Sequence, residues 1–152
     1  MKAAGFSFTI AARDGEARAG TLATPHGDVP TPAFMPVATY GAVRGLEAAT
    51  LASIGARIVL ANTYHLHERP GEAVVARLGG LHGFTGWRGP WLTDSGGYQV
   101  TSLSDRAVVD ESGVTFASAR DGTRRKLTPE NVVAIQEALG PDIAMTLDEC
   151  RP

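Results

Sequence analysis

Apolar and polar residues alternate near the start of the chain, in FSFTI at 6–10, and a period of two is typical of a half-buried β-strand. An Asp14-Gly15 pair follows, which favours a tight turn, and ARAGTLAT at 17–24 has the composition of a returning strand. We therefore predict an antiparallel β-hairpin over about 5–24. The proline-rich segment after it is predicted to be irregular, apart from one short apolar run.

From about residue 46 onward, helical patterns alternate with short apolar runs that are typical of strands buried on both faces. Thr128 and Pro129 offer an N-cap and first position for the last helix, and Gly140 offers its end. This alternation predicts a parallel sheet. Helices are predicted at 46–56, 71–80 and 130–139, strands at 57–62, 90–95 and 142–150, and an inserted hairpin turning on Ser112-Gly113 at 108–118.

Polar residues follow each of these predicted strands. Asn62 comes after the first, Asp94 and Ser95 end the second, and Asp148 and Glu149 end the third. Because ligands bind at the carboxyl ends of strands in parallel α/β folds, these side chains are expected to converge on one site. The alternative is that each residue caps the turn that follows it, as Asp and Asn often do. Three polar strand ends in register favour the functional interpretation.

The type of sheet follows from the glycine motifs and the chain length. No G-x-G-x-x-G or P-loop motif follows a strand, which argues against a dinucleotide or nucleoside triphosphate site. A (β/α)8 barrel fits the polar strand ends but needs about 250 residues. With AFMPVA at 33–38 included, the 152 residues supply four barrel strands. We therefore predict one α/β domain, the N-terminal half of a TIM barrel, with the hairpin at about 5–24 and βα units at about 33–152.

The amino-acid composition adds little to the fold prediction but bears on the class of protein and its expected location. Hydrophobic residues make up 43% of the chain and charged residues 20%, as in ordinary globular proteins. We find neither a signal peptide nor a run of about 18 apolar residues, so we expect no membrane association. The single cysteine, Cys150, excludes an intrachain disulfide and suits the cytoplasm.

The net charge of −2 does not indicate nucleic-acid binding for the chain as a whole. One local basic cluster is an exception, and two interpretations of it remain open. It is either a patch for a nucleic acid or a solvated hairpin. Its members are Arg120, Arg124, Arg125 and Lys126.

Four longer motifs stand in order along the chain: TPAFMPVATYGAVRGL, ANTYHLHERPG, LTDSGGYQV and PENVVAIQEALGPDIAMTLDEC. Together they resemble the N-terminal half of the tRNA-guanine transglycosylase (queuine tRNA-ribosyltransferase) family, most closely its bacterial branch. The resemblance runs from about Phe6 to Pro152. It implies exchange of the guanine at the wobble position of tRNA for the 7-deazaguanine preQ1, through a covalent tRNA-enzyme intermediate. It also implies a (β/α)8 barrel with structural zinc, a homodimer, and the tRNA anticodon loop as partner.

The resemblance assigns roles to the strand-end residues. Asp94 corresponds to the acid/base carboxylate, described as the proton acceptor, and Asp148 to the aspartate that recognises the base. The segment from Ser95 to Tyr98 corresponds to a loop that lines the base pocket. The substrate-binding residues implied are Asp94, Ser95, Gly96, Gly97, Tyr98 and Asp148, with Asn62 and Cys150 as further candidates.

These roles are physically reasonable. Guanine presents N1–H and an amino group side by side, and a carboxylate such as Asp148 accepts both hydrogen bonds. Adenine lacks this pair of donors and would leave buried groups unpaired. Tyr98 offers a ring on which a base can stack, worth roughly 1–3 kcal/mol. Gly96 and Gly97 permit close approach of the backbone and positive φ.

The resemblance places the nucleophilic aspartate and the zinc ligands, three cysteines and a histidine, beyond residue 152. No metal ligand is expected in this chain, and Cys150 alone cannot form a structural zinc site. We therefore expect the 152 residues alone to be inactive. The chain also departs from the family pattern at two positions beside the predicted pocket, Ala61 and Leu147, which leave the proposed chemical groups in place.

Two other classes of function compete with this one. A metal-dependent barrel hydrolase would use His65, His67, Asp94 and Asp148 as ligands. A non-catalytic base-binding protein, or a paralogue that depends on a partner, would explain the missing nucleophile. Two other histidines, His26 and His82, are predicted to be surface residues without partners.

Overall fold

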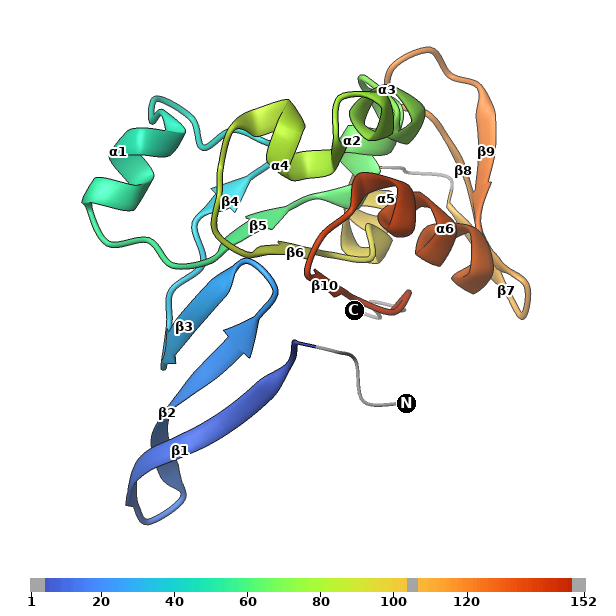
Figure 1. The fold of residues 1–152 in the computed structure, drawn as a ribbon. Helices are drawn as coiled ribbons and strands as arrows, with labels where there is room; N and C mark the ends of the chain where they lie inside the picture. Colours follow the sequence, from blue (N-terminus) through green and yellow to red (C-terminus); the bar gives the residue numbers. More distant parts are fainter. Residues whose placement is uncertain (1–4, 104–106, 149–152) are drawn as a thin grey trace.

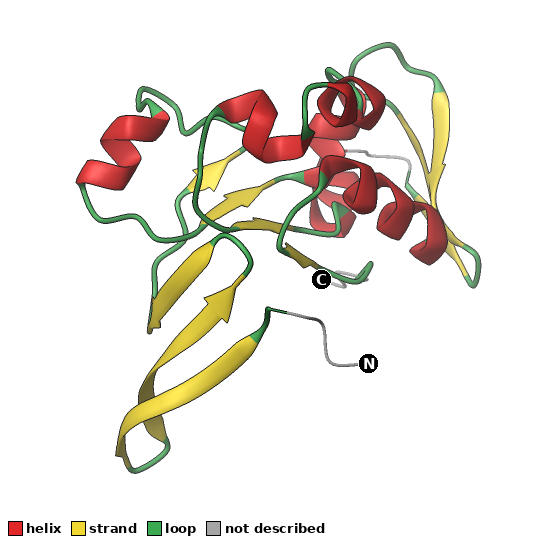
Figure 2. Cartoon of the chain, viewed as in Figure 1, coloured by secondary structure: helices red, strands yellow, loops and turns green. Residues whose placement is uncertain are grey.

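A computed structural model of the protein describes residues 5–103 and 107–148. Within these residues the chain is a mixed α/β structure with three sheets (Figure 1). An antiparallel sheet forms at the N-terminus, a parallel sheet lies at the centre, and a second antiparallel sheet lies near the C-terminal helix. Most of the helices lie above the parallel sheet in the view of Figure 2, and the N-terminal sheet lies below it.

The N-terminal sheet contains the predicted hairpin and one strand that was not predicted. β1 (Ser7–Asp14) pairs antiparallel with β2 (Ala17–Thr24), and Gly15 takes a φ of 55° in the turn between them. β3 (Gly27–Thr31) then pairs with β2, so the prediction of an irregular segment was wrong there. Pro30 is tolerated because β3 is an edge strand, where a missing N–H need not break a ladder.

The predicted parallel sheet is confirmed. Its strands are β4 (Val37–Ala38), β5 (Val59–Ala61), β6 (Trp91–Thr93) and β10 (Ile143–Ala144). They are ordered β4-β5-β6-β10, each parallel to its neighbour, so the spatial order follows the chain. The three polar strand ends therefore lie at the same edge of one sheet.

The helices are short, and only three of the six in the described residues were predicted. Those three are α1, α3 and α6, while α2, α4 and α5 occupy segments that had no helical pattern. Each unpredicted helix starts at or just after a polar strand end or a glycine, and six or seven residues are too few to show a period. Their bounds are Ala48–Ser53 (α1), Thr63–Glu68 (α2), Glu72–Arg77 (α3), Gly80–Thr85 (α4), Gly97–Leu103 (α5) and Pro129–Leu139 (α6).

Helix α6 has the ends that the sequence predicts. Thr128 accepts a hydrogen bond from the backbone N–H of Asn131, whose side chain in turn accepts from the N–H of Thr128, a capping box. Gly140 ends the helix in the left-handed conformation, with φ 68°. Such an N-cap contributes about 1 kcal/mol. The buried face of α6 consists of Val132, Ile135, Gln136 and Leu139.

The second antiparallel sheet contains the predicted inserted hairpin and a third strand. β7 (Val108–Asp110) and β8 (Gly113–Ala117) turn at the predicted position, and β9 (Arg124–Leu127) pairs with β8. Phe116 and Leu127 join the hydrophobic core with Trp91, which ties this sheet to the central one. No helix in the described part of the chain has the length and apolar character needed to cross a membrane.

Candidate functional site

The structure brings the predicted strand-end residues together at the carboxyl edge of the parallel sheet. Asn62 follows β5 and donates its side-chain amide to Asp94, which follows β6. Ser95 donates its hydroxyl to Asp148, which follows β10. We call these four residues the strand-end cluster. The expected convergence of three strand ends is thus present in the fold.

The carboxylate of Asp94 is held by donors from two helices. Its Oδ1 accepts from the backbone N–H of Thr63 at 2.8 Å, and its Oδ2 accepts from Asn62 and from Gln99 Nε2 at 3.2 Å. The Thr63 hydroxyl also donates to the backbone carbonyl of Asp94 at 2.5 Å. Because donors reach both oxygens, the orientation of this carboxylate is well determined.

This arrangement follows from how α2 begins. Helix α2 starts at Thr63, directly after β5, and its first N–H groups have no partner within the helix. The neighbouring strand β6 supplies the acceptor, because Asp94 lies beside the end of β5, where its N–H donates to the Ala61 carbonyl at 3.2 Å. The aspartate therefore serves as a capping group from another strand, and its position is fixed by the sheet.

Asp148 is approached closely by the backbone after β6. The Ser95 hydroxyl, which donates to Asp148, also accepts from the N–H of Gly97 at 3.1 Å. A Cβ at Gly97 would lie 2.4 Å from the Asp148 carbonyl oxygen and 2.8 Å from its Oδ1, so only glycine fits there. Gly96 has a φ of 80°, which also favours glycine. Positive φ at Gly96 and close backbone approach at Gly97 are thus both present.

One detail of the predicted pocket segment needs correction. The resemblance implied a loop from Ser95 to Tyr98, but helix α5 already begins at Gly97, so only the first half of the segment is loop. Tyr98 lies in the first turn of α5 and is 64% exposed, so its ring is accessible to a stacking partner. Cys150, a further predicted substrate-binding candidate, lies outside the described residues.

Sequence reasoning missed a buried amide next to the cluster. Gln136 of α6 is fully buried, and its side chain reaches Thr93 at the end of β6 and the backbone of Met145 after β10. A polar residue on the otherwise apolar face of α6 was the signal available in the sequence. Buried amides of this kind are retained where their hydrogen bonds are satisfied.

His65 lies on α2 near Asp94. Burial lowers the pKa of its imidazole, and the nearby carboxylates of Asp94 and Glu68 oppose that shift in part. Its ring contacts Tyr40 and Tyr64 edge-on, each at 5.2 Å between centroids. These ring contacts place the imidazole in a partly buried environment near Asp94.

The four residues that a metal-dependent hydrolase would use as ligands do not form a metal-binding group in the described part of the chain. His67, which would be one of its ligands, is bonded through Nδ1 to Glu72 at 2.7 Å. Over 5–103 and 107–148, the one group of three side chains spaced closely enough for a metal ion consists of His26, His82 and Asp142. Neither histidine of that group belongs to the predicted ligand set.

His26 is exposed, as the sequence suggested, and His82 is half-buried, but neither histidine lacks partners. Their rings stack at 3.6 Å, and His26 Nδ1 lies 2.8 Å from the buried carboxylate of Asp142. His82 also bonds to the Gly89 carbonyl at 3.1 Å, and Asp142 accepts from the N–H of Trp91 at 2.9 Å. The group fastens the β2–β3 turn and α4 to the segment before β10.

Two of the four residues of the basic cluster pair with carboxylates, which belong to α2 and to the same sheet. Arg125 pairs with Glu68 at 2.9 Å and lies 3.7 Å from Asp121, and Lys126 pairs with Asp110 at 3.3 Å. These contacts favour the solvated-hairpin interpretation over a nucleic-acid patch, because two of the four charges are already compensated.

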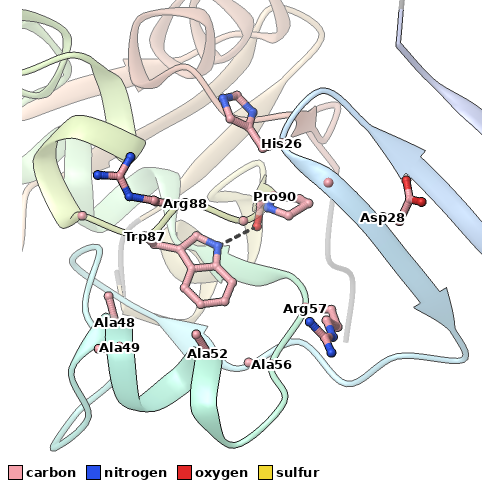
Figure 3. A pocket seen from close by; sticks show the side chains of 13 residues that line it. His26, Asp28, Ala48, Ala49, Ala52, Ala56, Arg57, Trp87, Arg88 and Pro90 are labelled. Atoms are coloured by element: carbon pink, nitrogen blue, oxygen red, sulfur yellow. Dashed lines mark hydrogen bonds between the residues drawn. The ribbon is translucent and has the colours of Figure 1, made fainter.

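A separate cavity of about 530 Å³ lies between α1 and the β2–β3 turn. Its floor includes Trp87, whose indole N–H donates to the Pro90 carbonyl at 3.2 Å, and the alanines of α1 lie beside this ring (Figure 3). Arg57 and Asp28 lie toward its other side. None of the sequence-predicted site residues that the structure describes lines this cavity.

The comparisons with known proteins agree on one family. Residues 14–152 match the family model described as queuine tRNA-ribosyltransferase. The chain is 58% identical over 147 residues to the queuine tRNA-ribosyltransferase of Thermus thermophilus, covering 97% of this chain and 38% of that protein. It is 58% identical over 149 residues to the protein of the same name from Gloeobacter violaceus, covering 98% and 39%. The chain thus spans about two fifths of the length of these curated relatives.

Proposed function

Because the chain belongs to the queuine tRNA-ribosyltransferase family, we propose that the protein exchanges guanine at the wobble position of tRNA for a 7-deazaguanine. For the incoming base we propose preQ1, on the resemblance to the bacterial branch. The observation that carries the proposal is the strand-end cluster, in which Asp94 and Asp148 follow two adjacent strands and Ser95, next to Asp94, donates a hydrogen bond to Asp148. Base exchange needs one group that recognises the base by hydrogen bonding and another that transfers its proton.

Asp148 is proposed to read the base. N1–H and the exocyclic amino group of guanine form a pair of adjacent donors, which a carboxylate accepts with its two oxygens. The Ser95 hydroxyl donates to Asp148 Oδ1 and would restrict the rotation of this carboxylate. Tyr98, which is exposed, would stack on the base and offset part of the cost of unstacking it from the RNA.

Asp94 is proposed to move the proton. The bond that is exchanged joins C1′ of the ribose to N9 of guanine, so the incoming base must lose the proton on its corresponding nitrogen before it can form that bond. A carboxylate next to the base accepts that proton and returns it to the departing guanine in the other half of the reaction. In the covalent route, a second carboxylate attacks C1′ and is displaced by the new base. That nucleophile is expected C-terminal to residue 152.

The barrel is proposed on the sheet geometry. The order β4-β5-β6-β10 follows the chain, as in a (β/α)8 barrel. Within the described residues, β4 and β10 are the two edges of the sheet, and edges need a further strand to pair with. Phe34 before β4 is 84% exposed, and Val37 within it is 52% exposed, so this edge presents apolar surface that further strands would cover.

Zinc, the homodimer and the cytoplasmic location are part of the same proposal. The described residues contain no cysteine, so they do not fit a thiolate-rich zinc site, and no step of the chemistry above depends on one. The zinc ligands are expected with the nucleophile. A cytoplasmic location and a contact with the anticodon loop follow from the tRNA substrate, and the resemblance suggests a homodimer.

The test is base exchange by the protein at its full natural length. Radiolabelled guanine should be incorporated into a tRNA with guanine at position 34, and unlabelled preQ1 should then displace it. A tRNA with adenine at position 34 is the control and should remain unlabelled. Binding of guanine without incorporation would favour a non-catalytic base-binding protein, and absence of both would refute the proposal. The 152 residues alone should show no exchange.

A further inference from the structure

Strand β10 is very short for an element that leads to a functional carboxylate. It pairs with β6 at only two positions, Ile143 with Leu92 and Ala144 with Thr93. Beyond it, Met145 donates its N–H to the Thr93 carbonyl at 3.1 Å, and no further strand pairing is present in the described residues up to Asp148. Something other than the sheet must therefore hold this segment in place.

The side chain of Gln136 supplies that support. Its Nε2 donates to the Met145 carbonyl at 2.8 Å, and its Oε1 accepts from the Met145 N–H at 3.0 Å. One side-chain amide thus makes both hydrogen bonds that a neighbouring strand would make with this residue. The Met145 N–H is shared between Gln136 and the Thr93 carbonyl.

The same amide is tied to the other strand of the site. The Thr93 hydroxyl donates to Gln136 Oε1 at 2.6 Å, and both side chains are completely buried. Thr93 directly precedes Asp94, and Met145 precedes Asp148 by three residues. Gln136 therefore sits between the two chain segments that carry the two carboxylates.

We propose that Gln136 is a positioning residue that sets the separation of Asp94 and Asp148, and thereby the ability of the site to select guanine. This inference rests on the proposed function, because it concerns the same two carboxylates. Gln136 itself does not touch the base. It acts by holding Met145 against Thr93. The Ser95–Asp148 hydrogen bond joins the same two chain segments a second time, at the carboxylate of Asp148.

A purely structural role would be the alternative, since a buried and satisfied amide stabilises any core. The two roles differ in what they change. Loss of stability lowers the amount of folded protein and affects all ligands equally. A shift of Asp148 relative to the pocket affects most the ligand that uses both of its oxygens.

Guanine and hypoxanthine separate these effects, because hypoxanthine lacks the exocyclic amino group. The experiment measures the affinities of both bases by calorimetry, in the protein at full length and at a temperature where circular dichroism shows each variant folded. The variants are Gln136→Met, which keeps the volume without polar atoms, and Thr93→Val, which removes only the hydroxyl donor. Val132→Ala is the control, because Val132 is also fully buried on α6 but contacts the network only through its carbonyl.

The preference for guanine over hypoxanthine should fall by about tenfold in Gln136→Met and by less in Thr93→Val, and should not change in Val132→Ala. Gln136→Glu provides a rescue. Its carboxylate cannot donate to the Met145 carbonyl, but its protonated form can, so the preference relative to wild type should recover as the pH is lowered.

An unchanged preference in both Gln136→Met and Thr93→Val would overturn the inference and leave the proposed function standing. If Gln136→Met does not fold, Thr93→Val and the pH response of Gln136→Glu decide the matter in the same way. A wild-type protein that binds guanine no more tightly than hypoxanthine would instead refute the base-reading role of Asp148, and with it both proposals.

Discussion

The hydroxyl of Ser95 donates a hydrogen bond to the carboxylate of Asp148, and this bond joins the segment after β6 to the segment after β10. Ser95 is 4% exposed, so the bond is shielded from water at one end. The same oxygen accepts from the N–H of Gly97, the first residue of α5. A single serine thus connects the proposed base-reading carboxylate to the helix that presents Tyr98.

Replacing this serine should weaken base binding more than it weakens the fold. Ser95→Ala removes one hydrogen bond to a carboxylate and one acceptor for Gly97, and bonds to charged groups contribute roughly 1.5–3 kcal/mol. Guanine affinity, measured by calorimetry in the full-length protein, should fall by about tenfold to a hundredfold. Ser102→Ala is the control, since Ser102 is an exposed serine on helix α5, which begins two residues after Ser95. Equal affinities in the two variants would remove Ser95 from the site.

The order of elements was predictable where the sequence shows a period or a strong end signal. Helix α6 has eleven residues, a threonine N-cap and a glycine C-cap, and its bounds were predicted to within one residue. Helices α2 and α5 were missed because six or seven residues do not display a helical period. Strand β3 was missed because prolines usually indicate irregular backbone, and an edge strand tolerates them.

For the site, residue types were predictable and their partners were not. A polar residue after each of three strands is a local pattern, so Asn62, Asp94 and Asp148 could be singled out from the sequence. That Asp94 caps α2 through the Thr63 N–H depends on the register of β5 against β6, which is a contact over about thirty residues. Gln136 and Met145 are close in sequence, but only the packing of α6 on the sheet brings them together. Tertiary contacts of this kind are not encoded in any local period.

Asp94→Asn should nearly abolish base exchange and leave the fold intact. The amide oxygen can still accept from the Thr63 N–H, but an amide has no useful basicity and cannot take a proton from the base. The exchange rate should drop by about 100- to 10,000-fold, the usual contribution of general acid–base catalysis. Labelled guanine incorporation into tRNA measures it, with the exposed Asp14→Asn as control. Undiminished turnover in Asp94→Asn would mean that another group moves the proton.

Asp148→Asn should weaken the binding of the base and should not act on the proton-transfer step. One acceptor oxygen becomes an NH₂ group that faces a donor of guanine, so guanine affinity should fall by at least about tenfold. Hypoxanthine, which offers one donor fewer, should lose less affinity. Competition binding with the two bases checks this, and the exposed Asp28→Asn serves as the matched control. Loss of both bases to the same extent would point to a general disruption of the pocket.

The stability of the protein should fall when the pH is lowered from 7.5 to 5.5, and His82 should account for part of this loss. Burial lowers the pKa of His82, the adjacent His26 lowers it further, and Asp142 and the Gly89 carbonyl oppose both effects. Below the ordinary histidine pKa of about 6.5, the unfolded chain therefore binds a proton more readily than the folded protein does. The free energy of unfolding is then highest above this pH and decreases as the pH falls through the window between the two pKa values. His65, whose pKa burial also lowers, adds to the slope with the same sign.

Denaturant unfolding at pH 5.5, 6.5, 7.5 and 8.5 measures this slope, and His82→Gln tests its origin. Glutamine keeps a donor for the Gly89 carbonyl but does not titrate, so the variant should show a shallower pH dependence even if it is less stable at pH 8.5. Asp110→Asn is a suitable control. Hydrogen bonds from Ser112 and Lys126 lower the pKa of the Asp110 carboxyl below its ordinary value of 3.8, so its contribution is lost only in stronger acid. A slope that is the same in wild type and His82→Gln would show that His82 does not contribute to it. A gain of stability on acidification that disappears in His82→Gln would show that Asp142 instead holds His82 in its charged form.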